Sequence, residues 1–306
     1  MKNLLSFILP IITFISCNTQ ATKSSERTEK REFMELLRDD FELLKPKDES
    51  YVVVVLFGGY PEKAKDIKRE FNIAETAREK GIAILYMNYN QRLWLEESEK
   101  QLLAQQLSGI FSELSLPSDT IYFGGFSSGG NVALLISDYL VKHTYDIQPK
   151  GVFVVDAPID LAALYRSAEK NVARNFSEPS VQESKWIVQK LGERFGTPDK
   201  NIQAYAQYGI YTSQIKSFKN IVNLHNVPLR FYSEPDTSWW KKHRKADFDQ
   251  LNAFYLEELS KQLKKAGFKH VEYVATENKG YRANGDRHPH SWSIVDIDKL
   301  MDWITK

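Results

Sequence analysis

The sequence predicts an α/β protein built on a doubly wound, mainly parallel sheet. Six short apolar runs are separated by longer stretches with helical spacing, and most of the runs are apolar at nearly every position. Runs of this kind are typical of strands that are buried on both faces, as in a parallel sheet covered by helices. A chain of 306 residues that is 42% hydrophobic can bury one large core, and its net charge of +1 gives no indication of nucleic-acid binding.

The elements follow one another in a regular order. Each parallel pair needs a right-handed crossover, which the helical stretches supply. The expected strands are residues 51–60, 82–90, 120–125, 151–158, 227–235 and 270–276. The expected helices are residues 33–44, 63–80, 92–115, 131–143, 247–267 and 293–306.

One interval is too long for a simple crossover. More than sixty residues between Asp160 and Asn226 have irregular helical character, contain many aromatic residues, and include FSEPS and FGTPDK as turns. We interpret residues 160–226 as a helical cap inserted over the carboxyl edge of the sheet. The alternative is an ordinary pair of packing helices with their loops. With this insertion, residues 33–306 are expected to form one domain.

The N-terminus has the pattern of a targeting segment. One lysine precedes an apolar stretch, residues 4–15, which is too short to span a bilayer. The only cysteine, Cys17, follows it, and this arrangement resembles a bacterial lipoprotein signal, in which the cysteine becomes the lipid-bearing first residue after cleavage. The resemblance implies a signal peptide over residues 1–16, a polar tether over residues 17–32, export, and a lipid anchor as the only membrane contact. There are two alternatives. One is a plain signal peptide, which would give a periplasmic or secreted protein, and the other is a buried apolar helix.

The stretch Gly125-Phe126-Ser127-Ser128-Gly129 has the pattern G-x-S-x-G between an expected strand and an expected helix. In that context a serine is held on a sharp turn with its hydroxyl exposed, and glycines two positions away allow strand and helix to approach. Centring the pattern on Ser128 would place Phe126 and Gly130 at the glycine positions, so Ser127 fits better. A glycine-rich turn or a phosphate cradle is the alternative, but the chain has no P-loop lysine.

On this turn and on the order of its elements, the chain resembles the α/β-hydrolase superfamily over residues 50–306. The resemblance implies a serine esterase or lipase with a Ser-His-Asp triad and an oxyanion hole of backbone amides. One amide is that of Ser128, next to the nucleophile. The second comes from the loop Phe57-Gly58-Gly59-Tyr60, where Gly59 and Tyr60 are both candidates; the histidine that often begins this loop in the family is absent.

A serine hydroxyl needs a base, and the base needs a carboxylate that orients it. Of six histidines, His288 and His290 lie in a polar loop before the last helix, where the family places its base. We choose His290, whose backbone is fixed by Pro289 and the helix start, and keep His288 as the alternative. For the acid we choose Asp236, which follows the fifth strand.

Two other carboxylates remain open as the acid. Glu234 also follows the fifth strand, and Asp156 ends the fourth, where some members of the family carry the acid. Trp239 and Trp240 follow Asp236, where their rings would allow stacking on a sugar or aryl acyl group. Arg282 and Arg287 flank the histidine loop, where they would allow contact with a substrate carboxylate. Cap contacts and loop ion pairs explain these four residues equally well.

The expected function is hydrolysis of a carboxylic ester, on a small molecule or a glycan, through an acyl-enzyme on Ser127. This chemistry calls for no cofactor and no metal. Two other functions stay open. One is a peptidase or amidase that uses the same triad, and the other is a surface-binding lipoprotein that has lost the reaction.

Overall fold

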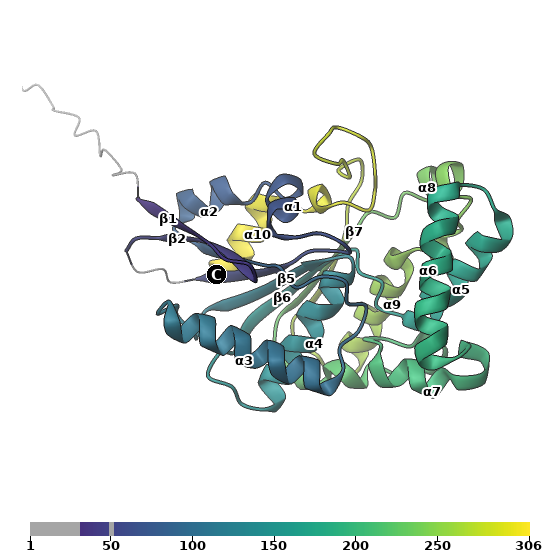
Figure 1. Ribbon diagram of the computed structural model, residues 1–306, viewed down its shortest axis with the longest axis horizontal. Coiled ribbons are helices and arrows are strands. Elements are labelled where there is room, and N and C mark those ends of the chain that lie inside the picture. Colours follow the sequence, from purple (N-terminus) through teal and green to yellow (C-terminus); the bar gives the residue numbers. More distant parts are fainter. Residues whose placement is uncertain (1–30, 49–51) are drawn as a thin grey trace, which may run out of the picture. The chain divides into compact units, whose positions relative to one another are not determined.

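The protein is described here by a computed structural model of residues 31–48 and 52–306. The expected signal peptide, Cys17 and nearly all of the tether lie outside these residues. In the described residues the chain forms one sheet of eight strands, in the order β1-β2-β4-β3-β5-β6-β7-β8 (Figure 1). The strands are β1 Phe33–Leu37, β2 Phe41–Pro46, β3 Val53–Phe57, β4 Ala83–Met87, β5 Ile121–Phe126, β6 Pro149–Val155, β7 Leu229–Ser233 and β8 Val271–Ala275.

All six predicted strands are present, as β3 to β8, and each pairs in parallel with its neighbours among them. Because strands β3, β5, β6 and β7 are adjacent and parallel, the loops that follow them meet at one edge. Phe126, the last residue of β5, lies opposite Val155 of β6, which in turn lies opposite Tyr232 of β7. The residue after each strand therefore projects from the same edge, where ligands bind in open α/β sheets.

The helix predicted for residues 33–44 is wrong. These residues form the antiparallel hairpin β1–β2, and β2 joins the rest of the sheet through an antiparallel pairing with β4. The stretch FMELLRDDFELL satisfies both a helical and a strand period, so its spacing does not discriminate between the two. The turn around Asp39 breaks the run, and Phe41 and Leu43 of β2 are then buried in the core.

Helices cover both faces of the sheet. The α-helices are α1 Ala64–Glu70, α2 Ala74–Lys80, α3 Glu97–Glu113, α4 Ser128–Lys142, α5 Leu161–Arg174, α6 Glu178–Phe195, α7 Pro198–Tyr208, α8 Thr237–Arg244, α9 Asn252–Lys265 and α10 Ile297–Ile304. Short 3₁₀-helices occur at η1 Ser213–Ile215, η2 Lys219–Asn226, η3 Phe248–Gln250 and η4 Trp292–Ile294. Figure 1 shows α1, α2 and α10 on one face and α3, α4 and α9 on the other.

The alternation of side chains along β3 explains the two layers. Val53, Val55 and Phe57 pack into the core under α3, α4 and α9. Val54 and Leu56 point to the opposite face and pack into the core under α1, α2 and α10. Every residue of β3 is thus fully buried, which is why its sequence is apolar throughout rather than alternating.

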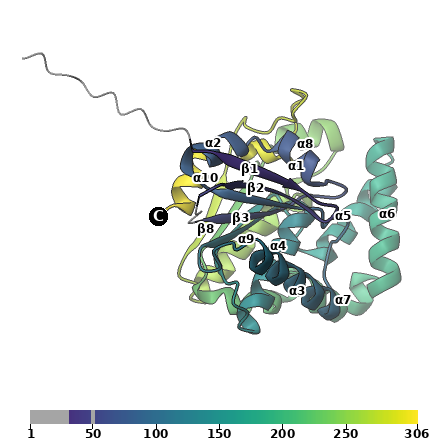
Figure 2. The same cartoon turned by 60° about the vertical axis from the view of Figure 1, so that its left-hand side comes forward.

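Residues 160–226 form α5, α6, α7, η1 and η2. Helices α5, α6 and α7 share a separate apolar cluster that includes Tyr165, Leu191 and Phe195. Figures 1 and 2 both place these three helices beyond the end of the strands that carries the loops following β5 and β6. None of the described helices combines the length and the apolar character that crossing a membrane requires.

Candidate active site

Ser127 follows β5 directly and is the last residue before α4. Its backbone has φ 51° and ψ −129°, a combination that L-residues rarely adopt, and its amide donates to the carbonyl of Val155 at 2.9 Å. The surrounding packing requires glycine, since a Cβ on Gly125 would lie 2.1 Å from the carbonyl oxygen of Gly129. Strain of this kind persists only when neighbouring structure holds it in place, and it is concentrated at functional sites. The predicted turn is formed with Ser127 at its apex.

The side chain of His290 contacts Asp156. Nδ1 of His290 lies 2.6 Å from Oδ2 of Asp156, whose side chain is almost fully buried. Asp156 directly follows β6 and also has a positive φ, 46°. Its backbone is held on both sides, because its amide donates to the carbonyl of Tyr232 and its own carbonyl accepts from the side-chain amide of Asn252. Two neighbouring strands therefore end in two strained polar residues, Ser127 and Asp156.

The structure does not bring Asp236, the acid chosen from the sequence, to His290. Asp236 is the N-cap of α8, where its carboxylate accepts the amide of Trp239 at 2.9 Å, and it also pairs with Arg287 at 2.8 Å. The carboxylate of an N-cap is directed at the first helical turn, so it is not available to a histidine across the sheet edge. Asp156, one of the two alternatives, occupies the position expected of Asp236.

Glu234, the other alternative, has a supporting position. It follows β7, is 3% exposed, and accepts hydrogen bonds from the amides of Lys279 and Gly280 at 2.8 and 2.9 Å. It also pairs with Arg287, whose guanidinium in turn donates to the carbonyl of Gly280. These contacts tie the end of β7 to the loop that carries His290, so Arg287 is a structural residue rather than a free cation in the site.

His288 has no carboxylate partner within residues 31–48 and 52–306. Its Nδ1 accepts the amide of His290 at 3.2 Å, and its ring packs against Trp239 and Trp240. Burial, together with the nearby His290 ring and the cationic Arg282 and Arg244, lowers the pKa of His288 to about 3. The ring is therefore neutral at ordinary pH, and of the two candidates only His290 has the carboxylate partner that a general base needs.

The expected oxyanion amides differ in availability. The amide of Gly59 donates to Oε2 of Glu62 at 2.9 Å, so this donor is already occupied. The amide of Tyr60 makes no hydrogen bond within the described part of the chain, and the amide of Ser128, as the first residue of α4, lacks an acceptor in its own helix. Gly59 nevertheless lies against the serine, because a Cβ built on it would be 3.0 Å from Cβ of Ser127.

Glu62 thus fixes the loop after β3. Besides Gly59, its carboxylate accepts the indole N–H of Trp292 at 3.1 Å. Burial raises the pKa of Glu62, and the two hydrogen bonds and the nearby charge of Arg282 oppose this shift only partly. Sequence reasoning did not single out Glu62, and a glutamate three residues after a glycine pair is not a pattern that could have identified it.

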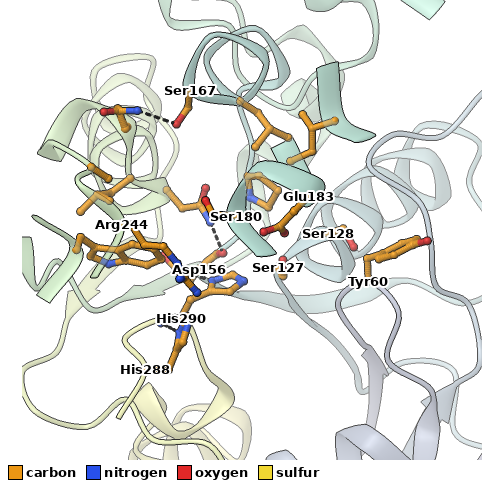
Figure 3. A pocket seen from close by; sticks show the side chains of 18 of the residues that line it. Tyr60, Ser127, Ser128, Asp156, Ser167, Ser180, Glu183, Arg244, His288 and His290 are labelled. Atoms are coloured by element: carbon orange, nitrogen blue, oxygen red, sulfur yellow. Dashed lines mark hydrogen bonds and ion pairs between the residues drawn. The ribbon is translucent and has the colours of Figure 1, made fainter. Parts of the chain in front are cut away.

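These residues surround a cavity of about 690 Å³. Figure 3 shows Ser127, Asp156 and His290 converging on it, with Tyr60 on one side and Arg244 on the other. Helices α5 and α6 supply a wall, and Trp186 of α6 packs on Tyr60 with their rings 4.8 Å apart. The Ser127 hydroxyl makes no hydrogen bond to His290 within the described residues; such contacts are often long before substrate binds.

The described residues contain no group of three or more histidine, cysteine, aspartate or glutamate side chains arranged to hold a metal ion. The polar groups around the cavity are instead a hydroxyl, an imidazole paired with a carboxylate, and unpaired backbone amides. Such a set can deprotonate a hydroxyl and stabilise a developing oxyanion.

No family model and no curated protein matches the chain. Several solved structures are similar to it. An esterase from Pyrococcus furiosus is 14% identical with a TM-score of 0.52, over 90% of this chain and 88% of that one. An α/β hydrolase from Vibrio vulnificus is 15% identical with a TM-score of 0.51, over 91% and 81%. An acylaminoacyl peptidase from Pyrococcus horikoshii is 14% identical with a TM-score of 0.51, over 92% of this chain and 42% of that one.

The chain has the α/β-hydrolase fold. The fold class predicted from the sequence is therefore confirmed. At identities this low, the likeness concerns the fold alone, and an activity must be argued from the site itself. In this chain, the loops after β3, β5 and β6 carry the groups described above, and the loop before α10 carries His290.

Proposed function

We propose that this protein is a serine hydrolase that cleaves a carboxylic ester through an acyl-enzyme. The observation that carries the proposal is the 2.6 Å contact of Asp156 with His290, beside Ser127 on a strained turn in the same cavity. In this proposal Ser127 is the nucleophile, His290 the base and Asp156 the acid. The fold shared with esterases supports it without deciding the reaction.

The first half of the reaction follows from this arrangement. The carboxylate of Asp156 accepts a hydrogen bond from Nδ1–H of His290, which fixes the tautomer whose Nε2 lone pair is available to the serine. As Oγ of Ser127 attacks the ester carbonyl, its proton passes to Nε2, and the carbonyl oxygen becomes an oxyanion. The amides of Ser128 and Tyr60 are the donors for that oxyanion, because Gly59 already donates to Glu62.

The second half regenerates the enzyme. The carbon–oxygen bond to the alcohol breaks, and the imidazolium of His290 gives its proton to the departing alkoxide. Water then donates a proton to Nε2 and attacks the acyl carbon, and collapse of the second tetrahedral intermediate returns the proton to Ser127 and releases the acid. Throughout, the carboxylate of Asp156 stabilises the imidazolium without taking its proton.

A fluorophosphonate probe tests the nucleophile. The wild-type protein should be labelled and Ser127→Ala should not, because only an activated serine attacks the phosphorus. Ser128→Ala is the matched control: its hydroxyl is buried and its amide is retained, so labelling should persist. Labelling that survives Ser127→Ala and disappears in Ser128→Ala would transfer the role to Ser128.

The bond is tested with a matched ester and anilide of the same acyl group. Ester cleavage should be faster by orders of magnitude, because an alkoxide is a better leaving group than an anilide anion and His290 can protonate either one. A faster anilide would favour the peptidase or amidase alternative. No turnover of either, with no labelling, would favour a binding protein.

We also propose that the protein is exported and lipid-anchored through Cys17, which rests on the N-terminal sequence alone. A labelled fatty acid fed to producing bacteria should appear in the wild-type protein and not in Cys17→Ser. Export of an unlabelled wild-type protein would leave only the plain signal peptide.

A further inference from the structure

Three arginines near the cavity have no ion-pair partner among the residues that the structure describes. Elsewhere in the described residues, each arginine lies within 4.0 Å of a carboxylate oxygen. The exceptions in this part of the chain are Arg174, Arg244 and Arg282. Arg244 and Arg282 line the cavity that contains Ser127, and Arg174 reaches its wall through one neighbour.

Arg282 lies next to the reacting groups. Its guanidinium carbon is 5.8 Å from the centre of the Phe126 ring, and the same ring packs on His290 at 4.5 Å. Because Phe126 immediately precedes Ser127, a cation above this ring is close to both the base and the nucleophile. The side chain is half-buried, so its charge is only partly screened by water.

Arg244 approaches from the end of α8. Its contact within the described residues is a weak hydrogen bond of 3.4 Å from Nη1 to the hydroxyl of Ser177. Figure 3 places Arg244 on the side of the cavity where His288 and His290 lie. Arg282 and Arg244 are both among the causes that lower the pKa of His288, after burial and the His290 ring, so both cations lie near this ring.

Arg174 is a third cation next to the cavity. It donates to Oε1 of Gln250 at 2.5 Å, and Gln250 in turn donates to the hydroxyl of Ser167. Gln250 and Ser167 both line the cavity, whereas Nη1 of Arg174 is buried and has no partner in the described residues. A guanidinium without a counter-charge at a partly buried site is costly, and an anion would compensate for it.

The carboxylates of the cavity are engaged elsewhere. Asp156 pairs with His290, Glu234 pairs with Arg287, and Glu62 accepts from Gly59 and Trp292. Glu183 is also in the lining, but it is exposed on α6, and Figure 3 shows it on the side of Ser127 and Tyr60, away from Arg244. Within the described residues, no carboxylate forms an ion pair with Arg244 or Arg282. Glu62 is near enough to Arg282 for their charges to interact, but its two hydrogen bonds go to Gly59 and Trp292.

We propose that the ester substrate carries an anionic group, such as a carboxylate, on its alcohol part, and that Arg244 and Arg282 bind this group. This inference rests on the proposed function. It concerns the alcohol part because His290 delivers a proton to the departing alkoxide, so the alcohol lies on the histidine side of the cavity, where both arginines are. Guanidinium groups bind carboxylates through paired, charge-assisted hydrogen bonds, which suits this role.

A matched pair of esters tests the specificity. One is the acetate ester of para-hydroxybenzoate, and the other is the acetate ester of its neutral methyl ester. We expect the ratio of kcat/KM for the anionic over the neutral ester to fall about tenfold or more in Arg282→Gln and in Arg244→Gln, as for loss of a hydrogen bond between charged groups. Using the ratio removes the difference in intrinsic reactivity between the two phenols.

Arg38→Gln is the matched control, because it removes an exposed arginine paired with Glu113 outside the cavity and should leave the ratio unchanged. Arg282→Lys keeps the charge and should retain much of the preference. An unchanged ratio in both folded glutamine variants would overturn the inference. A second pair of esters carries the carboxylate, or its neutral methyl ester, on the acyl part. If the anionic-over-neutral ratio falls in the glutamine variants for this second pair only, the assignment to the alcohol part is overturned.

A binding measurement separates this inference from the proposed hydrolysis. Titration of para-hydroxybenzoate, the anionic product, into Ser127→Ala by calorimetry should give binding that weakens about tenfold or more in Ser127→Ala/Arg282→Gln. Arginine-dependent binding without any esterase activity would reject the hydrolase and keep the anion site. Serine-dependent esterase activity without this binding would keep the hydrolase and reject the anion site.

Discussion

Asp156 and His290 are 134 positions apart in the chain, yet their side chains are joined at 2.6 Å. The contact depends on the strained backbone of Asp156, whose positive φ turns the side chain out of β6. Glu234 contributes from the other direction, because it holds the histidine loop through the amides of Lys279 and Gly280. The orientation of the base is thus fixed from β6 and from β7 at once.

Asp156→Asn should lower kcat/KM for an ester by about three to four orders of magnitude, because asparagine cannot stabilise the imidazolium and favours the wrong tautomer of His290. Asp236→Asn should keep most of the activity. Its side chain caps α8 and pairs with Arg287, so its loss should cost about 1 kcal/mol of unfolding free energy at most. Steady-state kinetics on both variants decide between the two carboxylates, and a larger loss in Asp236→Asn would restore the choice made from the sequence.

The fold was largely predictable because its central strands are buried on both faces. A run such as residues 53–57, in which every side chain is buried, has no other common explanation between two helical stretches. The hairpin β1–β2 was not predictable in the same way. Most of the β1 side chains face solvent, so they impose no clear period, and only the pairing with β4 determines that this segment is a strand.

The site was predictable where it depends on local sequence. Ser127 lies on a turn whose first glycine, Gly125, is required by the backbone of Gly129 four positions later, and the motif therefore appears as a short pattern. Gly129 itself is required by the carbonyl oxygens of Phe57 and Gly58 in the loop after β3. The choice among Asp156, Glu234 and Asp236 depends instead on which carboxylate faces a loop far along the chain. Arg244 and Glu62 depend on the same tertiary packing, and no spacing in the sequence encodes it.

Gly125→Ala should abolish most of the activity. The added methyl group would lie 2.1 Å from the carbonyl oxygen of Gly129, so the start of α4 would have to move and would displace Ser127. We expect a loss of about 1–3 kcal/mol in unfolding free energy, as for other overpacked positions. Gly109→Ala is the matched control, because nothing lies within 4 Å of its added Cβ in the exposed middle of α3. It should stabilise the protein by about 0.5–1 kcal/mol in urea unfolding and leave catalysis intact.

Arg287→Ala should destabilise the protein by about 3 kcal/mol, because it leaves the almost fully buried carboxylate of Glu234 without its cation. The histidine loop should loosen as well, so kcat should fall more than KM changes. Arg38→Ala removes an exposed ion pair that water and salt screen, so it should cost much less than Arg287→Ala. Urea unfolding of the two variants compares a buried pair with an exposed one, and equal losses would argue that Glu234 is held by its backbone donors alone.

Glu62→Gln should make the protein relatively more stable as the pH rises. Burial raises the pKa of Glu62 in the folded state above its unfolded value of 4.5. Its contribution to stability is therefore fully present below the unfolded pKa and is lost as the pH rises through the folded pKa. Glutamine does not titrate and can still accept from Gly59 and Trp292. The difference in unfolding free energy between Glu62→Gln and wild type should thus shift in favour of the variant between about pH 4 and about pH 7.

Urea midpoints at the two pH values measure this shift, and Glu79→Gln on the exposed surface of α2 controls for the loss of a surface charge. Glu62→Gln also reports on the oxyanion loop, because the side-chain carbonyl oxygen of the glutamine must replace the carboxylate as acceptor for the Gly59 N–H. If stability shifts with pH as expected while kcat stays within about tenfold of wild type, the hydrogen bond from Gly59 supports catalysis equally well with a neutral and with a charged acceptor. A difference in stability that is the same at both pH values would show that Glu62 ionises in the folded protein as freely as in the unfolded one.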